Sequence, residues 1–378
     1  MRMFAMVAAG LVVLIAGIGT PVPAADPIKI GFIGSITGYG SILGDPEVKA
    51  AKLRVKMINA AGGIKGRPVE LLIHDSEGSP EKAVLAMKRL VTQDKVPAVV
   101  GPDLSSTVRA VMPLVEESKI ISFVMTPVIK PPAGSYMFGI YPIQEHAYEA
   151  ELVWLKKKNL TKLGVLASTD TTGQEGVKFL RELAGKYGIT LAVENFNLQD
   201  VDVTPQLLTL QRGGAQAIMA AMSGKPFAVV AKGMKQLNMK LPLLASTGAV
   251  TRTLGELISG IEPEILIAPT LKVMVAEQLA DGDENKPVIM ELIKNYRQEY
   301  KEEPDLYAAA GWDATEMVLK AYAAAGPNPT AMRDWLEKMP KYVGAVCTVV
   351  MKPTDHHGCG PEGYVLVQFK NGKFMLEK

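Results

Sequence analysis

Short apolar runs alternate with amphipathic segments along the first third of the chain. Apolar runs rich in β-branched residues are typical of buried strands, and they occur at 28–33, 69–73, 98–101 and 120–124. Between them, apolar residues recur every three to four positions, which predicts helices at 46–59, 80–93 and 106–117. This alternation of strand and helix predicts a mostly parallel sheet with helices on both faces.

The same alternation begins again after Tyr141 and Pro142. The pattern predicts strands at 163–167, 190–195, 217–221 and 243–245, and helices at 145–158, 174–187, 205–212 and 225–237. Two blocks of this kind predict an α/β protein with two lobes, each built around a doubly wound sheet. Further along, we expect Tyr307, Trp312 and Asp313 on a helix, in the core or on the surface rather than in a cleft.

The composition is that of an ordinary globular protein. The chain has 378 residues, of which 48% are hydrophobic and 21% charged, and its formal net charge is +2. A chain of this length is long enough for two hydrophobic cores. Proteins that bind nucleic acid usually present a strongly basic surface, so a net charge this close to zero argues against such a partner.

The first 25 residues have the order of a secretory signal peptide. Arg2 gives a short positive region, an apolar run follows at 3–18, and small residues occupy most of 21–25. A membrane anchor is the alternative, but the run is shorter than the roughly 20 residues that a spanning helix needs. We therefore expect residues 1–25 to be removed by cleavage after Ala24 or Ala25, and the mature protein to be exported and soluble.

The chain has two cysteines, Cys347 and Cys359. In an exported protein, two cysteines separated by turn residues favour one disulfide, and two unpaired thiols are the alternative. A metal site formed by Cys359 with His356 and His357 has less support, because zinc normally takes four ligands at tighter spacing. We expect the disulfide, and neither a metal nor a cofactor.

One segment, INAAGGIKGRPVELLIHDSEGSP at 58–80, carries a family resemblance. Gly62 and Gly63 end a helix, since glycine adopts the left-handed cap at little cost, and a turn then leads into a strand. The segment resembles the type I periplasmic solute-binding proteins of ABC importers, in the leucine/isoleucine/valine-binding branch. The tail at 344–374 also looks like the closing β segments of that family.

The resemblance implies two lobes joined by a hinge that the chain crosses three times. The crossings are expected near Pro142, at 270–272 and near Pro361. Lobe I then comprises residues 26–142 and 272–360, and lobe II comprises residues 143–271 and 361–378.

The ligand is expected between the lobes, because open α/β sheets bind ligands beyond the carboxyl ends of their strands. The resemblance implies that Tyr39, in the loop after the first strand, covers an apolar group. It also implies that Ser105 or Ser106, at the start of a helix, binds a ligand carboxylate, although helix capping alone explains one of these serines.

Four further positions follow strands and align with family segments. Thr126 and Val128 align with the end of a "SPsAT" segment, where Val128 replaces a threonine, and Thr172 replaces the tyrosine of "nDYG". Ser223 and Thr247 follow strands of the second lobe. Amino-acid binders of the family often carry a glutamate for the ligand's ammonium group near Thr247, and the loop 246–249 has no acid. We therefore expect a carboxylate without an α-ammonium group to bind at least as well as leucine.

The resemblance implies a function in transport. We expect a monomeric periplasmic protein that captures a small carboxylate-bearing ligand, an amino acid or an aromatic or aliphatic acid, for an ABC transporter permease in the membrane. A ligand sensor that presents its lobe surface to a membrane receptor is the alternative. An exported enzyme has little support, because the chain has only four histidines and no Ser-His-Asp or Cys-His arrangement stands out.

Overall fold

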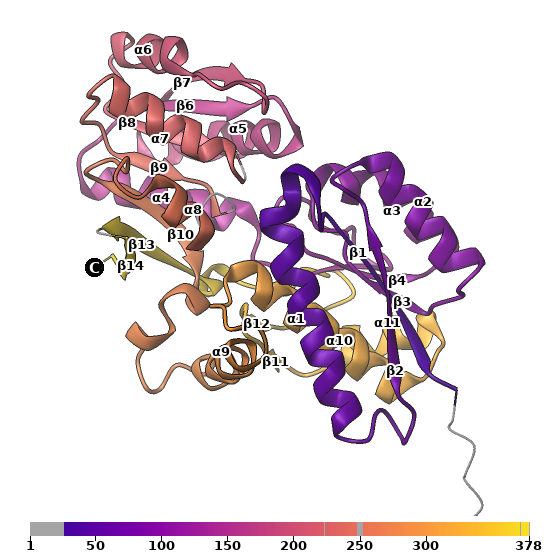
Figure 1. The fold of residues 1–378 in the computed structure, drawn as a ribbon. Helices are drawn as coiled ribbons and strands as arrows, with labels where there is room; N and C mark the ends of the chain where they lie inside the picture. The colour runs from indigo at the N-terminus through magenta and orange to yellow at the C-terminus, as the bar shows by residue number, and fades with distance from the viewer. Residues whose placement is uncertain (1–25, 223, 248–251, 371, 378) are drawn as a thin grey trace, which may run out of the picture.

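The computed structural model describes residues 26–222, 224–247, 252–370 and 372–377. The predicted signal peptide and Ser223 lie outside the described residues. Among the helices that the structure describes, none is long and apolar enough to cross a membrane. Two β-sheets, each covered by helices, form the body of the molecule (Figure 1).

The first sheet has five parallel strands in the order β2-β1-β3-β4-β5. Helices α1 and α10 pack together against it, and α2 packs against α3 on its other side. The strands are β1 (Ile28–Gly34), β2 (Val69–Asp75), β3 (Ala98–Val100), β4 (Ile121–Val124) and β5 (Met137–Gly139). The helices of this half are α1 (Ser41–Ala60), α2 (Pro80–Thr92), α3 (Ser105–Ser118), α9 (Lys286–Tyr300), α10 (Leu306–Ala325) and α11 (Pro329–Lys338).

The second sheet has seven strands in the order β14-β13-β10-β9-β8-β6-β7. Its first five strands in the chain are parallel, and β13 and β14 add an antiparallel edge. The strands are β6 (Lys162–Ser168), β7 (Thr190–Phe196), β8 (Ala217–Ala221), β9 (Leu243–Ala245), β10 (Leu266–Leu271), β13 (Tyr364–Lys370) and β14 (Lys373–Leu376). The helices of this half are α4 (Gln144–Lys157), α5 (Thr171–Leu183), α6 (Thr204–Arg212), α7 (Pro226–Gln236) and α8 (Arg252–Ile258). Helix α4 packs against α5, and α7 packs against α6 and α8.

The chain passes between the two halves three times. It leaves the first sheet after β5, returns after β10 toward α9, and enters the second sheet again at β13. This confirms the predicted fold class of two α/β lobes with a three-crossing hinge. The exact lobe limits, 26–142 with 272–360 and 143–271 with 361–378, stay a prediction.

Helix α1 begins five residues earlier than the sequence pattern predicts. Gly44 and Pro46 lie in its first two turns, and both residues normally disfavour a helix interior. Gly44 packs directly on the backbone of Ser35, where a Cβ would overlap the chain. Close packing on the loop after β1 therefore extends the helix beyond what local propensity predicts.

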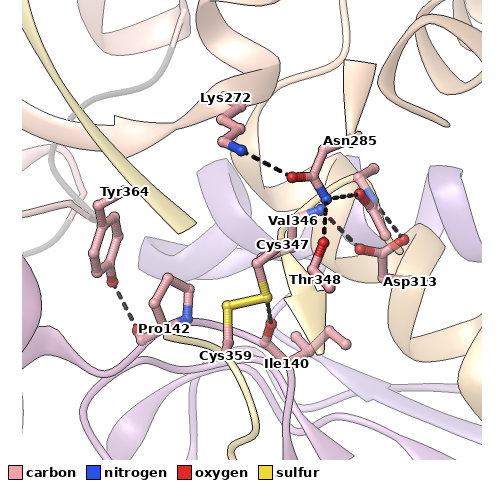
Figure 2. Close-up of a disulfide and its surroundings, with 12 residues drawn as sticks. Ile140, Pro142, Lys272, Asn285, Asp313, Val346, Cys347, Thr348, Cys359 and Tyr364 are labelled. Carbon is pink, nitrogen blue, oxygen red and sulfur yellow. Dashed lines mark hydrogen bonds between the residues drawn. A yellow bond between two sulfur atoms is a disulfide. The ribbon is translucent and has the colours of Figure 1, made fainter. Parts of the chain in front are cut away.

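The predicted disulfide between Cys347 and Cys359 is present, and both cysteines are buried. Cys347 lies in the turn of the hairpin formed by β11 (Tyr342–Val343) and β12 (Thr348–Val349), and Val349 bridges to Cys359. Figure 2 shows the disulfide beside the first and third crossings. The Cys347 sulfur lies 3.9 Å from the carbonyl oxygen of Ile140, next to the first crossing. Tyr364, at the third crossing, donates a hydrogen bond from its hydroxyl to the Pro142 carbonyl over 2.8 Å. The disulfide therefore lies at the hinge.

The two histidines beside the disulfide, His356 and His357, are both buried. One His356 ring nitrogen lies 3.1 Å from the Met137 carbonyl and the other 3.0 Å from a Glu337 carboxylate oxygen. His357 is buried against Gly139. Within the described part of the chain, no three or more His, Cys, Asp and Glu side chains are grouped so that they could hold a metal ion.

Candidate functional site

A cavity lies between the two sheets, at the carboxyl ends of their strands. It is lined by the loops after β3, β4 and β9, by the first turns of α1, α3, α4, α5 and α10, and by the first crossing. The lining residues are Leu43, Asp103, Leu104, Ser105, Met125, Thr126, Pro127, Val128, Tyr141, Gln144, Thr172, Thr247, Leu306 and Tyr307. The space that the centre of a water molecule can reach is about 30 Å³, enough for roughly two waters. A larger ligand therefore requires the lining or the lobes to move apart.

Ser105 and Thr126 form the polar wall of the first lobe. Ser105 is the first residue of α3, and its hydroxyl oxygen lies 2.9 Å from the Thr126 hydroxyl oxygen. Both side chains are buried. Each hydroxyl carries one hydrogen, and their mutual bond uses only one of the two. One hydroxyl hydrogen and the unpaired N–H groups at the start of α3 are thus free for an acceptor on a ligand.

Asp103 holds the loops of the first lobe together. It is buried, and its carboxylate accepts bonds from the Ser35 backbone N–H, the Ser35 hydroxyl and the Leu104 backbone N–H at 2.6, 2.9 and 2.8 Å. Burial raises the pKa of this carboxyl above its usual range, and the three hydrogen bonds oppose that change. The group therefore joins the loop after β1 to the loop after β3, and most of its acceptor capacity is used.

Two tyrosines form the apolar side of the cavity. The Tyr141 hydroxyl donates to the Leu306 carbonyl oxygen over 3.2 Å, and burial raises the pKa of both Tyr141 and Tyr307. Both side chains are therefore neutral phenols. The prediction that Tyr307 lies away from the cleft was wrong: the first turn of α10 brings it to the cavity, while Trp312 and Asp313 are buried farther along the helix.

A buried carboxyl lies close to this wall. Glu47 is one turn beyond Leu43 on α1, and neither of its carboxyl oxygens has a hydrogen-bond partner among the described residues. Burial raises its pKa well above the usual range, and the nearby carboxylates of Asp103 and Asp305 raise it further. Burial and the neighbouring carboxylates therefore favour the protonated form of Glu47.

The second lobe contributes Thr172, Thr247 and Gln144. Thr172 lies in the first turn of α5, which Asp170 caps by accepting a bond from the Gly173 N–H over 3.1 Å. The Thr247 hydroxyl donates to the Gln144 side-chain oxygen over 3.5 Å. The Gln144 side-chain nitrogen is buried and has no partner among the described residues. A buried donor of this kind normally has a partner, so an acceptor on a ligand is expected there.

The structure brings five of the eight predicted site residues together in the cavity lining: Ser105, Thr126, Val128, Thr172 and Thr247. Tyr39 and Ser106 lie outside it. Tyr39 is 46% exposed and packs against Gly78, and its pKa is raised by burial while a hydrogen bond with Ser106 opposes the change. Ser223 lies outside the described residues.

Sequence reasoning missed four lining residues of clear chemical interest. Tyr141 and Gln144 belong to the first crossing, which was interpreted as a boundary between lobes. Asp103 lies in a predicted ligand loop but was not singled out, and Leu306 comes from a helix distant in sequence. The one signal for Tyr141 and Gln144 was their place beside the predicted lobe crossing at Pro142, because such a crossing lies next to the cleft.

Comparisons with known proteins show the family. A family model described as "Periplasmic binding protein" matches residues 27–373. An "Amino acid binding protein" of Pseudomonas aeruginosa is 24% identical over 343 residues, which cover 85% of each chain. A "Leucine-, isoleucine-, valine-, threonine-, and alanine-binding protein" of the same species is 23% identical and covers 86% of this chain and 84% of the relative.

Solved structures show the same fold. The Rp1789 protein of Rhodopseudomonas palustris has a TM-score of 0.85 at 21% identity, and the match covers 93% of this chain and 100% of that one. A branched-chain amino acid ABC transporter protein of Thermus thermophilus with bound valine has a TM-score of 0.81 at 18% identity, covering 93% and 95%. With the family model matched over nearly its whole described length, the chain belongs to the periplasmic binding protein family.

Proposed function

We propose that the protein is the exported solute-binding component of an ABC importer. It captures a small carboxylate-bearing ligand in the cavity between its lobes and delivers it to a membrane permease. Membership of the periplasmic binding protein family supports this role. The observation that carries the proposal is the convergence of buried donors from both lobes on one cavity: Ser105 and Thr126 from the first, and Gln144 from the second.

A carboxylate suits these donors. It accepts several hydrogen bonds at once, and the start of α3 adds the partial positive charge of a helix N-terminus. Among the described lining residues no lysine or arginine occurs, so neutral donors hold the anion. Hydrogen bonds to a charged group contribute about 1.5–3 kcal/mol each, so two or three of them supply a large part of the roughly 8 kcal/mol that micromolar binding requires.

The arrangement of the donors explains why binding closes the lobes. A ligand that bonds to Ser105 and Gln144 at the same time contacts both lobes, and it does so best when they are close together. Closure is then a hinge movement of two rigid bodies around the ligand. The permease is expected to recognise the closed form.

We further propose that the preferred ligand lacks an α-ammonium group. Asp103 is the one acidic side chain in the described lining, and its carboxylate already accepts three hydrogen bonds from the protein. A buried ammonium group without a carboxylate of its own is costly. Amino acids are the competing ligand class, because two relatives are named as amino-acid-binding proteins.

Calorimetric titration tests both parts of the proposal. Leucine, valine, phenylalanine and 3-phenylpropionate are titrated separately into the purified mature protein. We expect 3-phenylpropionate to bind at least as tightly as leucine. Tight leucine binding with no response to 3-phenylpropionate would show that the amino-acid alternative is right.

Substitution of two neighbouring serines tests the anchor. Ser105→Ala is expected to weaken binding of the tightest ligand by about 1–3 kcal/mol, roughly five- to 150-fold in Kd. Ser106→Ala is the matched control, because Ser106 lies beside Ser105 on α3 but outside the cavity lining. Unchanged affinity in Ser105→Ala, or an equal loss in both variants, would exclude the start of α3 as the carboxylate site.

A further inference from the structure

A charged pair joins the two lobes beside the cavity. A guanidinium nitrogen of Arg109, on α3, lies 2.9 Å from a carboxylate oxygen of Glu175, on α5. Helix α3 packs on the first sheet and α5 on the second. The pair therefore bridges the two halves of the molecule.

The register of the two helices relates this pair to the cavity. Arg109 follows Ser105 by four residues on α3, so these two side chains lie on one face of that helix. Glu175 follows Thr172 by three residues on α5, so these two share one face of the second helix. Ser105 and Thr172 line the cavity. The ion pair thus lies one turn along from the cavity, on two helices that each carry one of its hydroxyl groups.

The pair lines a second hollow, which lies beside the cavity. Arg109 and Met112 line it from α3, Glu175 and Phe179 line it from α5, and Pro127 and Val128 form a wall that it shares with the cavity. Elsewhere along the cleft the lobes also come close together: a Cβ placed on Gly224 would lie 3.8 Å from the Ile42 side chain. The structure therefore has the lobes close together, and their separation would pull Arg109 away from Glu175.

We propose that Arg109 and Glu175 form a latch that favours the closed arrangement of the lobes over the open one. Their attraction acts at 2.9 Å and is largely screened once the charges are more than about 10 Å apart. Both side chains are partly exposed, at 53% and 24%, so the latch is weak and reversible. Lys178 lies 3.7 Å from Glu175 on the same helix, and it remains beside that carboxylate when the lobes separate.

The latch goes beyond the proposed function, because it acts on lobe closure whichever ligand binds. It raises the closed fraction of the protein before the ligand arrives, and it slows ligand release afterwards. An exposed ion pair of this kind changes the ratio of closed to open protein by roughly two- to fivefold.

Pulsed electron paramagnetic resonance on the ligand-free protein tests the latch. Nitroxide labels are placed at Leu85→Cys and Val201→Cys, positions that are 66% and 84% exposed and belong to different lobes. The native cysteines form a disulfide and take no label. The distance distribution between the labels gives the ratio of closed to open protein.

We expect the ratio of closed to open protein to fall two- to fivefold in Arg109→Gln and in Glu175→Gln. The double variant should show no further fall, because the effects of two substitutions that break the same ion pair do not add. Added salt should lower the ratio in the parent protein and leave Arg109→Gln unchanged. Arg297→Gln is the matched control: it breaks a pair with Glu303 of similar exposure within one lobe, and should change nothing. The thermal midpoint of each variant verifies its folding.

Three results would overturn the latch: a parent protein without a closed population, equal distributions in the parent and Arg109→Gln, or additive losses in the double variant. Because these measurements use no ligand, their failure leaves the calorimetric test of the proposed function intact. Absence of ligand binding would likewise leave the latch intact.

Discussion

Removal of the Cys347–Cys359 disulfide should destabilise the protein by an amount that follows from the chain it closes. The two cysteines are 12 residues apart in sequence. In the chain-entropy description, a crosslink over a loop of this length lowers the entropy of the unfolded state by about 10 cal/mol/K. At 25 °C this corresponds to about 3 kcal/mol of stability that the double variant Cys347→Ala with Cys359→Ala loses.

The native structure gives a reason why this entropic effect should dominate. The segment between the two cysteines keeps its own bonds, with the Val350 N–H donating to the Gly358 carbonyl over 2.9 Å. It is also held against β5, where the Gly139 N–H donates to the His356 carbonyl over 2.9 Å. The folded state of the double variant should therefore stay ordered, and the change should arise mainly in the unfolded state.

Urea unfolding, followed by circular dichroism, measures the loss. The double variant is compared with the oxidised parent, and equal slopes against urea show that both unfold to a comparable extent. Thiol titration of the parent before and after unfolding confirms that both cysteines are oxidised. A loss below about 1 kcal/mol would refute the reasoning, because the loop entropy would then have no measurable effect on stability.

Two further predictions concern stability. Burial lowers the pKa of His357 to about 4, whereas an imidazole in the unfolded chain has a pKa near 6.5. As the pH drops, the unfolded state therefore binds a proton before the folded state does. The free energy of unfolding should fall by up to about 3 kcal/mol between pH 6.5 and pH 4. Urea unfolding across this range should show a smaller fall in His357→Leu, and an unchanged fall would assign the effect to other groups. Gly44→Ala places a Cβ against the Ser35 backbone and should cost about 1–3 kcal/mol. Gly185→Ala, whose Cβ meets no atom within 4 Å, is its control, and equal thermal midpoints in the two variants would contradict the packing argument.

Local patterns predict the strands and helices that repeat around each sheet. The apolar runs at 98–101, 217–221 and 243–245 form the buried strands β3, β8 and β9, because a buried parallel strand needs apolar residues on both faces. The run at 69–73 forms the half-buried edge strand β2. The edge strand β5, which has three residues, was missed. Helix α10 is buried along most of its length, so it lacks the polar face by which amphipathic helices are recognised.

The sequence predicts those residues of the cavity lining whose position follows from strand order. Ser105, Thr126 and Thr247 come shortly after strands, and parallel strands bring such loops to one edge of a sheet. Leu306 and Tyr307 reach the same cavity from a helix about 200 residues later than Ser105, and nothing in their local pattern indicates this contact. The position of these two residues at the cavity depends on how the two lobes pack together. The hydrophobic pattern along the chain does not carry that information.

The first crossing connects the ligand cavity with the hinge. Tyr141 and Gln144 line the cavity, and Pro142 between them accepts the hydrogen bond from Tyr364 at the third crossing (Figure 2). The Gln144 backbone N–H donates to the Pro127 carbonyl over 2.9 Å, which joins this crossing to the loop that carries Thr126. Hinge movement requires backbone rotation in just such connecting segments. A ligand that bonds to Gln144 therefore contacts the hinge itself, so no long path is needed to couple binding to lobe closure.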